Sequence, residues 1–171
     1  STIDYVIIVF DAQHYGSRFD ADRLEDCTPA IEEMVSGYMY FCQTLLNRLA
    51  QKQNKTVVSF YLKAASGRRE SSLQKTPGVN PVTNSVAIAQ NAFIALAENY
   101  AVSFYQLPHV YTFLASSDSS NELFNNEKET GIWFSNYYVA LEDLKNRPDM
   151  KHSVSWIKTG SKMPSSFPFF R

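Results

Sequence analysis

Apolar runs and helical stripes of apolar residues alternate along the chain. The run YVIIVF at residues 5–10 is rich in β-branched side chains, which is the pattern of a strand covered on both faces. Further apolar runs at about 56–64, 109–116 and 152–160 predict three more strands. The first of these strands delivers Asp11 into a polar, aromatic loop.

The segment between the first two predicted strands predicts a long amphipathic helix. Thr28 is a suitable N-cap, Pro29 suits the first helical position, and Glu32 and Glu33 fall in the first turn. Apolar residues then recur at steps of three and four over about six turns. They are Ile31, Met34, Val35, Tyr38, Cys42, Leu45, Leu46 and Leu49.

Two more apolar stripes predict a second and a third helix later in the chain. The second helix is expected to begin at Thr83 or Asn84, and the third is expected to end before Pro148. Their apolar residues are Val86, Ala89, Phe93, Leu96, Ala97 and Tyr100 for the second helix, and Trp133, Tyr137, Ala140, Leu141 and Leu144 for the third. Residues 66–83 and 161–171 have no periodicity, so we expect a long loop and an irregular tail.

The alternation of strands and helices predicts an α/β fold with three layers, a Rossmann-like and mostly parallel sheet with helices on both faces. A length of 171 residues suits a single domain over residues 1–171. In such sheets ligands bind beyond the carboxyl ends of the strands. The residues that directly follow the strands are therefore the first candidates for function.

Composition narrows the classes of function. A net charge of −1 gives no overall attraction to nucleic acid or to an anionic membrane, so we expect neither as a direct partner. No apolar run approaches the ~20 residues of a membrane-spanning helix, and no leader peptide is recognised. Cys27 and Cys42 lack metal-ligand spacing and read as reduced thiols. The expected location is nuclear or cytoplasmic.

The sequence lacks the common signatures of nucleotide binding and of serine hydrolases. It contains no GxxxxGK[ST] and no GxSxG, and its first strand-to-helix turn has one glycine, Gly16, where a dinucleotide fingerprint requires three. The three histidines lie far apart in the sequence. What remains at the predicted carboxyl edge is a pair of aspartates, Asp11 after the first strand and Asp118 after the third.

Three segments of the chain resemble the von Willebrand factor A (VWA) family. In that family the first strand ends in DxSxS, a threonine opens a later helix, an aspartate follows a later strand, and together they hold one divalent metal ion. Here FDAQHY resembles the first motif, GVNPVTNSVAIAQNAF the loop with Thr83, and VYTFLASSDSSN the segment with Asp118. Gln13 and Tyr15 replace the two serines. The resemblance therefore implies a VWA fold with a degenerate site at Asp11, Thr83 and Asp118 and no cofactor.

Within this family the chain distantly resembles the smaller VWA-bearing subunits of the transcription/repair factor TFIIH. The shared features are the aromatic-glycine turn Tyr15-Gly16 after the first aspartate and the turn AQKQNKTVVSF between the first helix and the next strand. This chain does not contain the cysteine-rich zinc module of those subunits. The resemblance implies a non-catalytic scaffold that docks other protein subunits of an intracellular transcription or DNA-repair complex. The candidate partner-binding residues are Gln13, His14, Tyr15, Phe19 and Asp118, with Phe124 as a further aromatic anchor.

Two other interpretations of the aspartates stay open. Asp11 and Asp118 also suit caps of helix N-termini and of loop amides. In an enzyme, the same pair would hold Mg²⁺ in a nuclease of the PIN/NYN type, whose domains also begin with a strand that ends in aspartate. Such a nuclease needs three or four acidic side chains at this edge, and the sequence offers Asp20, Asp22 or Glu122 to complete the set.

Overall fold

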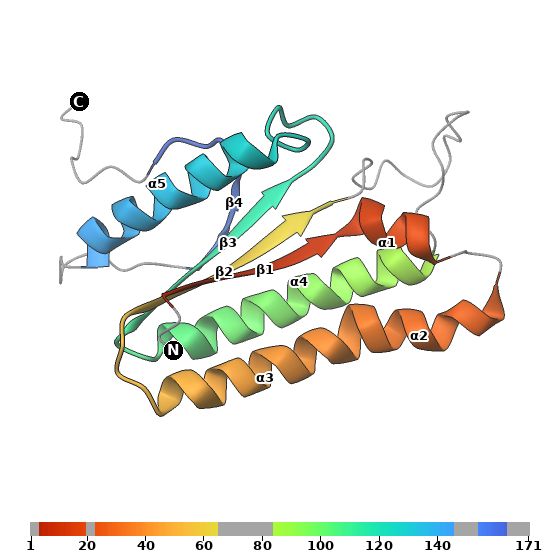
Figure 1. The fold of residues 1–171 in the computed structure, drawn as a ribbon, viewed down its shortest axis with the longest axis horizontal. Coiled ribbons are helices and arrows are strands. Elements are labelled where there is room, and N and C mark those ends of the chain that lie inside the picture. Colours follow the sequence, from red (N-terminus) through yellow and green to blue (C-terminus); the bar gives the residue numbers. More distant parts are fainter. Residues whose placement is uncertain (1–3, 20–22, 65–83, 146–153, 164–171) are drawn as a thin grey trace.

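The computed structural model describes residues 4–19, 23–64, 84–145 and 154–163 (Figure 1). Four strands form one sheet in which all neighbouring pairs are parallel, in the order β1-β2-β3-β4. Their bounds are Tyr5–Asp11 for β1, Thr56–Lys63 for β2, Val110–Ser117 for β3 and Trp156–Lys158 for β4. The first three strands lie where the sequence predicts them, and the fourth is shorter than predicted. The predicted loop at 66–83 and most of the predicted tail lie outside the described residues.

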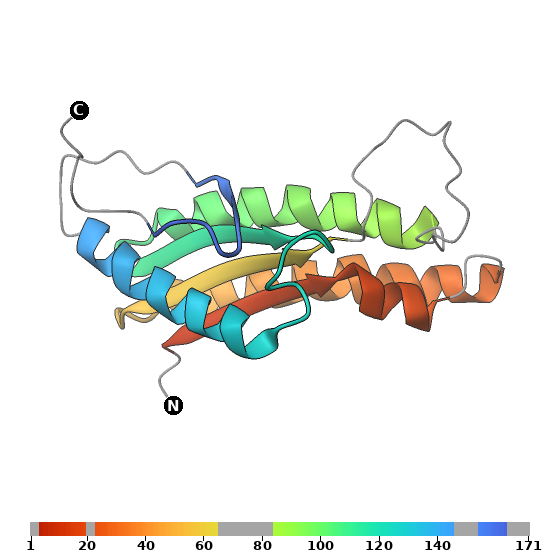
Figure 2. The ribbon, with the colours of Figure 1, turned by 90° about the horizontal axis from the view of Figure 1, so that it is seen from above.

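Helical segments lie between the strands. The predicted first long helix consists of α2, a π-helical turn η2 and α3, which follow one another without a gap. The bounds are Ala12–Arg18 for α1, Leu24–Asp26 for a 3-10 turn, Cys27–Ile31 for α2, Glu32–Ser36 for the π-helical turn η2, Gly37–Ala50 for α3, Asn84–Tyr105 for α4 and Glu127–Lys145 for α5. Figures 1 and 2 show α3 and α4 on one face of the sheet and α5 on the other. The predicted α/β class with three layers, a parallel sheet and helices on both faces is therefore confirmed.

The larger core lies between the sheet and the layer of α3 and α4. Phe93 of α4 packs against Phe10 of β1, with 5.2 Å between the ring centroids, and against Phe60 of β2. Removing each of these rings from water contributes about 1.5–3 kcal/mol. The predicted stripe of the first helix faces this core, except for Ile31, which is exposed.

A smaller, aromatic core lies under α5. Trp133, Phe134 and Tyr138 of α5 pack on Phe113 of β3 and Tyr61 of β2. These contacts place α5 mainly over β2 and β3, the two inner strands of the sheet. On the face of β1 that is turned toward α5, the ring of Tyr138 stacks on Tyr5 with 5.0 Å between the ring centroids.

β1 is buried on one face and open on the other. Ile8 and Phe10 point into the larger core, whereas Tyr5, Ile7 and Val9 are 56%, 42% and 41% exposed. The prediction that both faces of this strand are covered is wrong, because α5 lies over the inner strands and leaves the edge strand largely bare.

The order of the strands explains this open face. In doubly wound sheets the strand order reverses beside the first strand, which then has a neighbour on each side. Here the strand order follows the sequence order, so β1 has one neighbour among the described residues.

The crossover from β3 through α5 to β4 has the opposite hand to the two crossovers before it, because α5 lies on the face of the sheet opposite α3 and α4 (Figure 2). Right-handed crossovers are the strong norm in parallel sheets.

Candidate functional site

The carboxyl ends of β1, β2 and β3 lie level with one another. The register pairs Asp11 with Lys63 and Lys63 with Ser117, so a polar residue closes each strand at the same edge. The hydroxyl of Ser117 lies 2.7 Å from that of Tyr61, inside the aromatic core. This edge of the sheet is where parallel α/β proteins bind their ligands.

Asp11 has protein partners for both of its carboxylate oxygens. Its Oδ1 accepts hydrogen bonds from the amides of Gln13 and His14, at 3.0 and 3.1 Å, and so caps α1. Its Oδ2 lies 2.7 Å from Nζ of Lys63. Partial burial acts to raise the pKa of Asp11, but Lys63 and the two amides together hold that pKa below its usual value. The interpretation of Asp11 as a helix cap is confirmed.

Asp118 is engaged by the loop that follows β3. Its Oδ1 accepts hydrogen bonds from the amide of Ser120, at 3.0 Å, and from the Ser120 hydroxyl. Its Oδ2 lies 3.8 Å from Nζ of Lys158. β2 lies between the strands that carry Asp11 and Asp118, so two strand spacings, roughly 10 Å, separate their backbones. The interpretation of Asp118 as a cap of loop amides is confirmed.

The two carboxylates that a VWA-type metal site requires are already held by other groups of the protein. Among the described residues, no three His, Cys, Asp or Glu side chains form a group that could hold a metal ion. Gln13 is exposed, and the hydroxyl of Tyr15 lies 2.9 Å from that of Tyr38. Thr83 lies outside the described residues. The donor set that the structure does describe therefore does not fit the divalent ion of the VWA family.

The predicted partner-binding residues divide between the surface and the core. Gln13 and His14 are exposed on α1. Tyr15 is half-buried, with its ring centroid 5.1 Å from that of Phe10. Phe19 is only 6% exposed, because α1 lies against α4 and its C-terminal end turns into the core. Phe19, which the sequence makes a candidate for partner binding, is therefore a core residue in this structure.

Phe124, the further aromatic anchor that the sequence suggests, is also buried. Nζ of Lys63 lies 5.3 Å from the centroid of its ring. That distance is within the range of a cation–π contact. Lys63 therefore holds the carboxyl edge together on two sides, through Asp11 and through Phe124.

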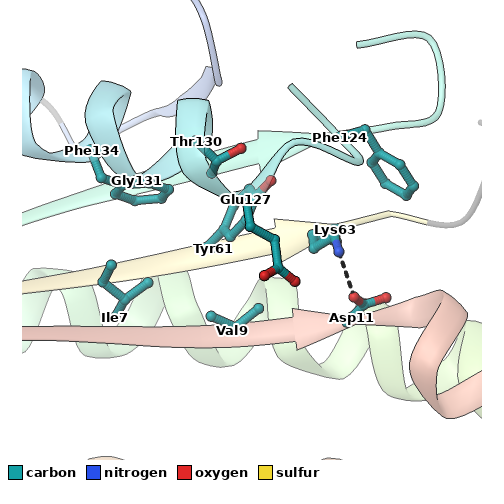
Figure 3. A pocket seen from close by; sticks show the side chains of 10 residues that line it. All are labelled: Ile7, Val9, Asp11, Tyr61, Lys63, Phe124, Glu127, Thr130, Gly131 and Phe134. Atoms are coloured by element: carbon teal, nitrogen blue, oxygen red, sulfur yellow. Dashed lines mark ion pairs between the residues drawn. The ribbon is translucent and has the colours of Figure 1, made fainter. Parts of the chain in front are cut away.

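A hollow of about 300 Å³ opens between β1, β2 and the N-terminal half of α5 (Figure 3). This first hollow is lined by Ile7, Val9, Asp11, Tyr61, Lys63, Phe124, Glu127, Thr130, Gly131 and Phe134. Figure 3 shows the Glu127 carboxylate pointing from α5 toward β1, near Val9 and the Lys63–Asp11 pair. Within the described residues Glu127 has no ion-pair partner. The first hollow is thus apolar along β1 and acidic at its carboxyl end.

A second hollow of about 250 Å³ lies on the opposite side of β1, beside η2 and α3, and is lined by Ile8, Val9, Glu33, Gly37, Tyr38 and Phe41. The hydroxyl of Tyr38 donates to the backbone oxygen of Val9 at 2.6 Å. Burial, together with Tyr15, raises the pKa of Tyr38 far above its usual value, so the phenol keeps the proton that it donates. Val9 lines both hollows, one on each side of the same strand.

Glycines within helices are a feature of the sequence that indicates these hollows. Each is lined by a glycine within a helix, Gly131 in α5 and Gly37 in α3. A glycine at such a position costs about 1 kcal/mol relative to alanine, so two of them in helices with clear stripes are unexpected. Both glycines leave room beside β1.

No protein-family model, curated protein or solved structure matches this chain. Among the described residues, no helix is both long enough and apolar enough to cross a membrane.

Proposed function

We propose that this chain is a VWA-like protein-interaction domain, a non-catalytic scaffold subunit of a multi-subunit complex. The observation that carries this proposal is the bare apolar face of β1, where Tyr5, Ile7 and Val9 follow one another along an edge strand. Contiguous apolar surface of this kind marks sites of interaction in soluble proteins. Two of these residues, Ile7 and Val9, also line the first hollow.

The state of the two aspartates supports a scaffold over an enzyme. A carboxylate that binds a metal ion or transfers a proton needs a free oxygen facing its substrate. Both oxygens of Asp11 and both oxygens of Asp118 instead face protein amides, a hydroxyl or lysines. Replacing these contacts by metal bonds would uncap α1 and leave Lys63 without its counter-ion.

The kind of complex is proposed from the sequence resemblance. The resemblance to the VWA-bearing subunits of TFIIH favours an assembly of transcription or DNA repair, with other protein subunits as the partners. A nuclear or cytoplasmic location accompanies this assignment.

A metal titration tests the scaffold against the nuclease. We expect the midpoint of thermal unfolding to stay unchanged when Mg²⁺ or Mn²⁺ is added to millimolar concentration, because a bound ion would stabilise the folded state. The matched control is Asp118→Asn, which removes a carboxylate of the nuclease pair. A rise in the midpoint for the wild type that is absent in Asp118→Asn would contradict the scaffold and favour a nuclease of the PIN/NYN type.

Purification from native cells tests the interaction itself. A tagged chain at its native expression level is expected to elute with another protein at a fixed stoichiometry, measured by light scattering after size exclusion. A chain that elutes as a monomer under all extraction conditions would contradict the proposed function.

A further inference from the structure

The outer edge of β1 presents backbone groups without a strand to pair with. The amide of Val57 donates to the backbone oxygen of Asp4 at 2.9 Å, so even-numbered residues of β1 turn their backbone groups toward β2. Tyr5, Ile7 and Val9 consequently turn theirs outward. Of these groups the oxygen of Val9 is engaged, by Tyr38. The described part of the chain supplies no strand for the remainder.

The two hollows lie where the side chains of an added strand would point. Residues of a strand alternate between the two faces of a sheet, about 3.3 Å apart along the strand. A strand placed along β1 would direct alternate side chains into the first hollow, beside α5, and into the second, beside α3. Val9 lines both hollows, so the two hollows lie on opposite faces of the sheet at this one edge.

The edge also lacks the features by which proteins prevent strand addition. Edge strands are usually protected by lysine, proline or a bulge. The run from Tyr5 to Phe10 contains no charged residue and no proline, and its pairing with β2 is continuous. Within the part of the chain that the structure describes, this edge is therefore open to a further strand, except at the backbone oxygen of Val9, which accepts from Tyr38.

The charges around the edge indicate what kind of strand fits. Glu33 of the second hollow and Asp11 of the first are neutralised by ion pairs with Arg18 and Lys63. Glu127 in the first hollow and Asp4 before β1 have no ion-pair partner within the described residues. These two carboxylates leave the surroundings of the edge with a net negative charge, so the rim is acidic. A second copy of this chain would bring the same acidic rim against it, whereas a basic segment would complement it.

We propose that β1 is the docking site for an extended segment of a partner protein, apolar along its length and basic at its ends, which adds to the sheet as a strand. This inference rests on the proposed function and specifies its surface and the chemistry of its partner. In such complexes backbone hydrogen bonds provide affinity, and pockets for alternate side chains provide specificity.

Synthetic peptides test the proposal directly. The probe is a peptide of about ten residues that alternates valine and threonine and is flanked by lysines, and its control carries glutamates in place of the lysines. By fluorescence anisotropy with the full chain, we expect the lysine peptide to bind roughly tenfold more tightly or better. Equal affinity of the two peptides would overturn the charge assignment and with it the proposal.

Backbone methylation tests whether the peptide pairs as a strand. Only every second amide of an added strand faces its neighbour. Of two lysine peptides with N-methyl groups on alternate amides, in the two possible patterns, one is expected to lose binding and the other to keep it. Loss in both patterns, or in neither, would overturn strand addition.

Matched variants locate the peptide on β1. Ile7→Lys places a charge on the bare face of β1, and Ile132→Lys makes the same change at a residue of α5 that is equally exposed but lines neither hollow. We expect Ile7→Lys to weaken the affinity for the lysine peptide by roughly tenfold or more, and Ile132→Lys to leave that affinity unchanged. Equal effects of the two variants would place the peptide elsewhere.

The same variants separate this inference from the proposed function. If the native partner stays bound to Ile7→Lys as well as it does to Ile132→Lys, the docking site is wrong and the scaffold function stands. If no native partner is found but the lysine peptide binds at β1, the site stands and the scaffold function fails.

Discussion

At the scale of single residues, Asp11 is predicted to stabilise the folded protein. Asp11→Ala removes the cap of α1 and the counter-ion of Lys63, so we expect the free energy of unfolding to fall by about 1–2 kcal/mol. Asp11→Asn keeps an oxygen that can cap α1 and should cost less. Urea unfolding at pH 7 measures both variants, and equal losses would show that the cap contributes nothing.

The pH dependence of the same variants provides a second test. Because the pKa of Asp11 is lowered in the folded protein, its charge stabilises the fold above the pKa of an unfolded aspartate, about 3.9. That contribution disappears as the pH falls through the lower, folded pKa. The difference in stability between wild type and Asp11→Asn should therefore be present at neutral pH and vanish in strong acid. A difference that is independent of pH would contradict the pairing with Lys63.

At the scale of the helix, Gly131 is predicted to be replaceable. A methyl group at Gly131 would meet no atom within 4 Å, so Gly131→Ala should raise the free energy of unfolding by about 1 kcal/mol through helix propensity. The matched control is Gly160→Ala, because Gly160 has a φ of +82° and alanine is strained there. Urea unfolding should show changes of opposite sign, and a loss for Gly131→Ala would mean that α5 needs this glycine for its fold.

The sequence predicted the type and order of the elements but not their placement. Periodicity located β1, β2 and β3 and the long helices because each has a regular apolar pattern, and the aspartates were found because they end strands. The run YVIIVF looks the same whether one face or both are covered, so the exposure of Ile7 could not be read from it. Whether Phe19 is exposed depends on where α1 packs, which involves residues far away in the chain.

At the scale of the whole molecule, hydrogen exchange should report the strand order. β2 has a neighbour on each side and is buried from Thr56 to Leu62, so its amides are expected to exchange most slowly. Along β1, the amides of Val6 and Ile8 face β2 and should be protected, whereas that of Ile7 faces outward and should exchange quickly. Equal protection of all three would mean that a further strand already pairs with β1. Binding of the lysine peptide should slow exchange at Ile7.

The steadily rising strand order also governs how the chain folds as it is made. Tyr5 pairs with Val57 and Thr56 with Val110, so each pairing must close a loop of about fifty residues. β1 leaves the ribosome before the other three strands, and it has no strand to pair with until β2 has been synthesised. No later strand of the described residues covers the other edge of β1, and unpaired strand edges are where nascent chains aggregate. Co-translational assembly with the partner would close that edge as soon as it forms.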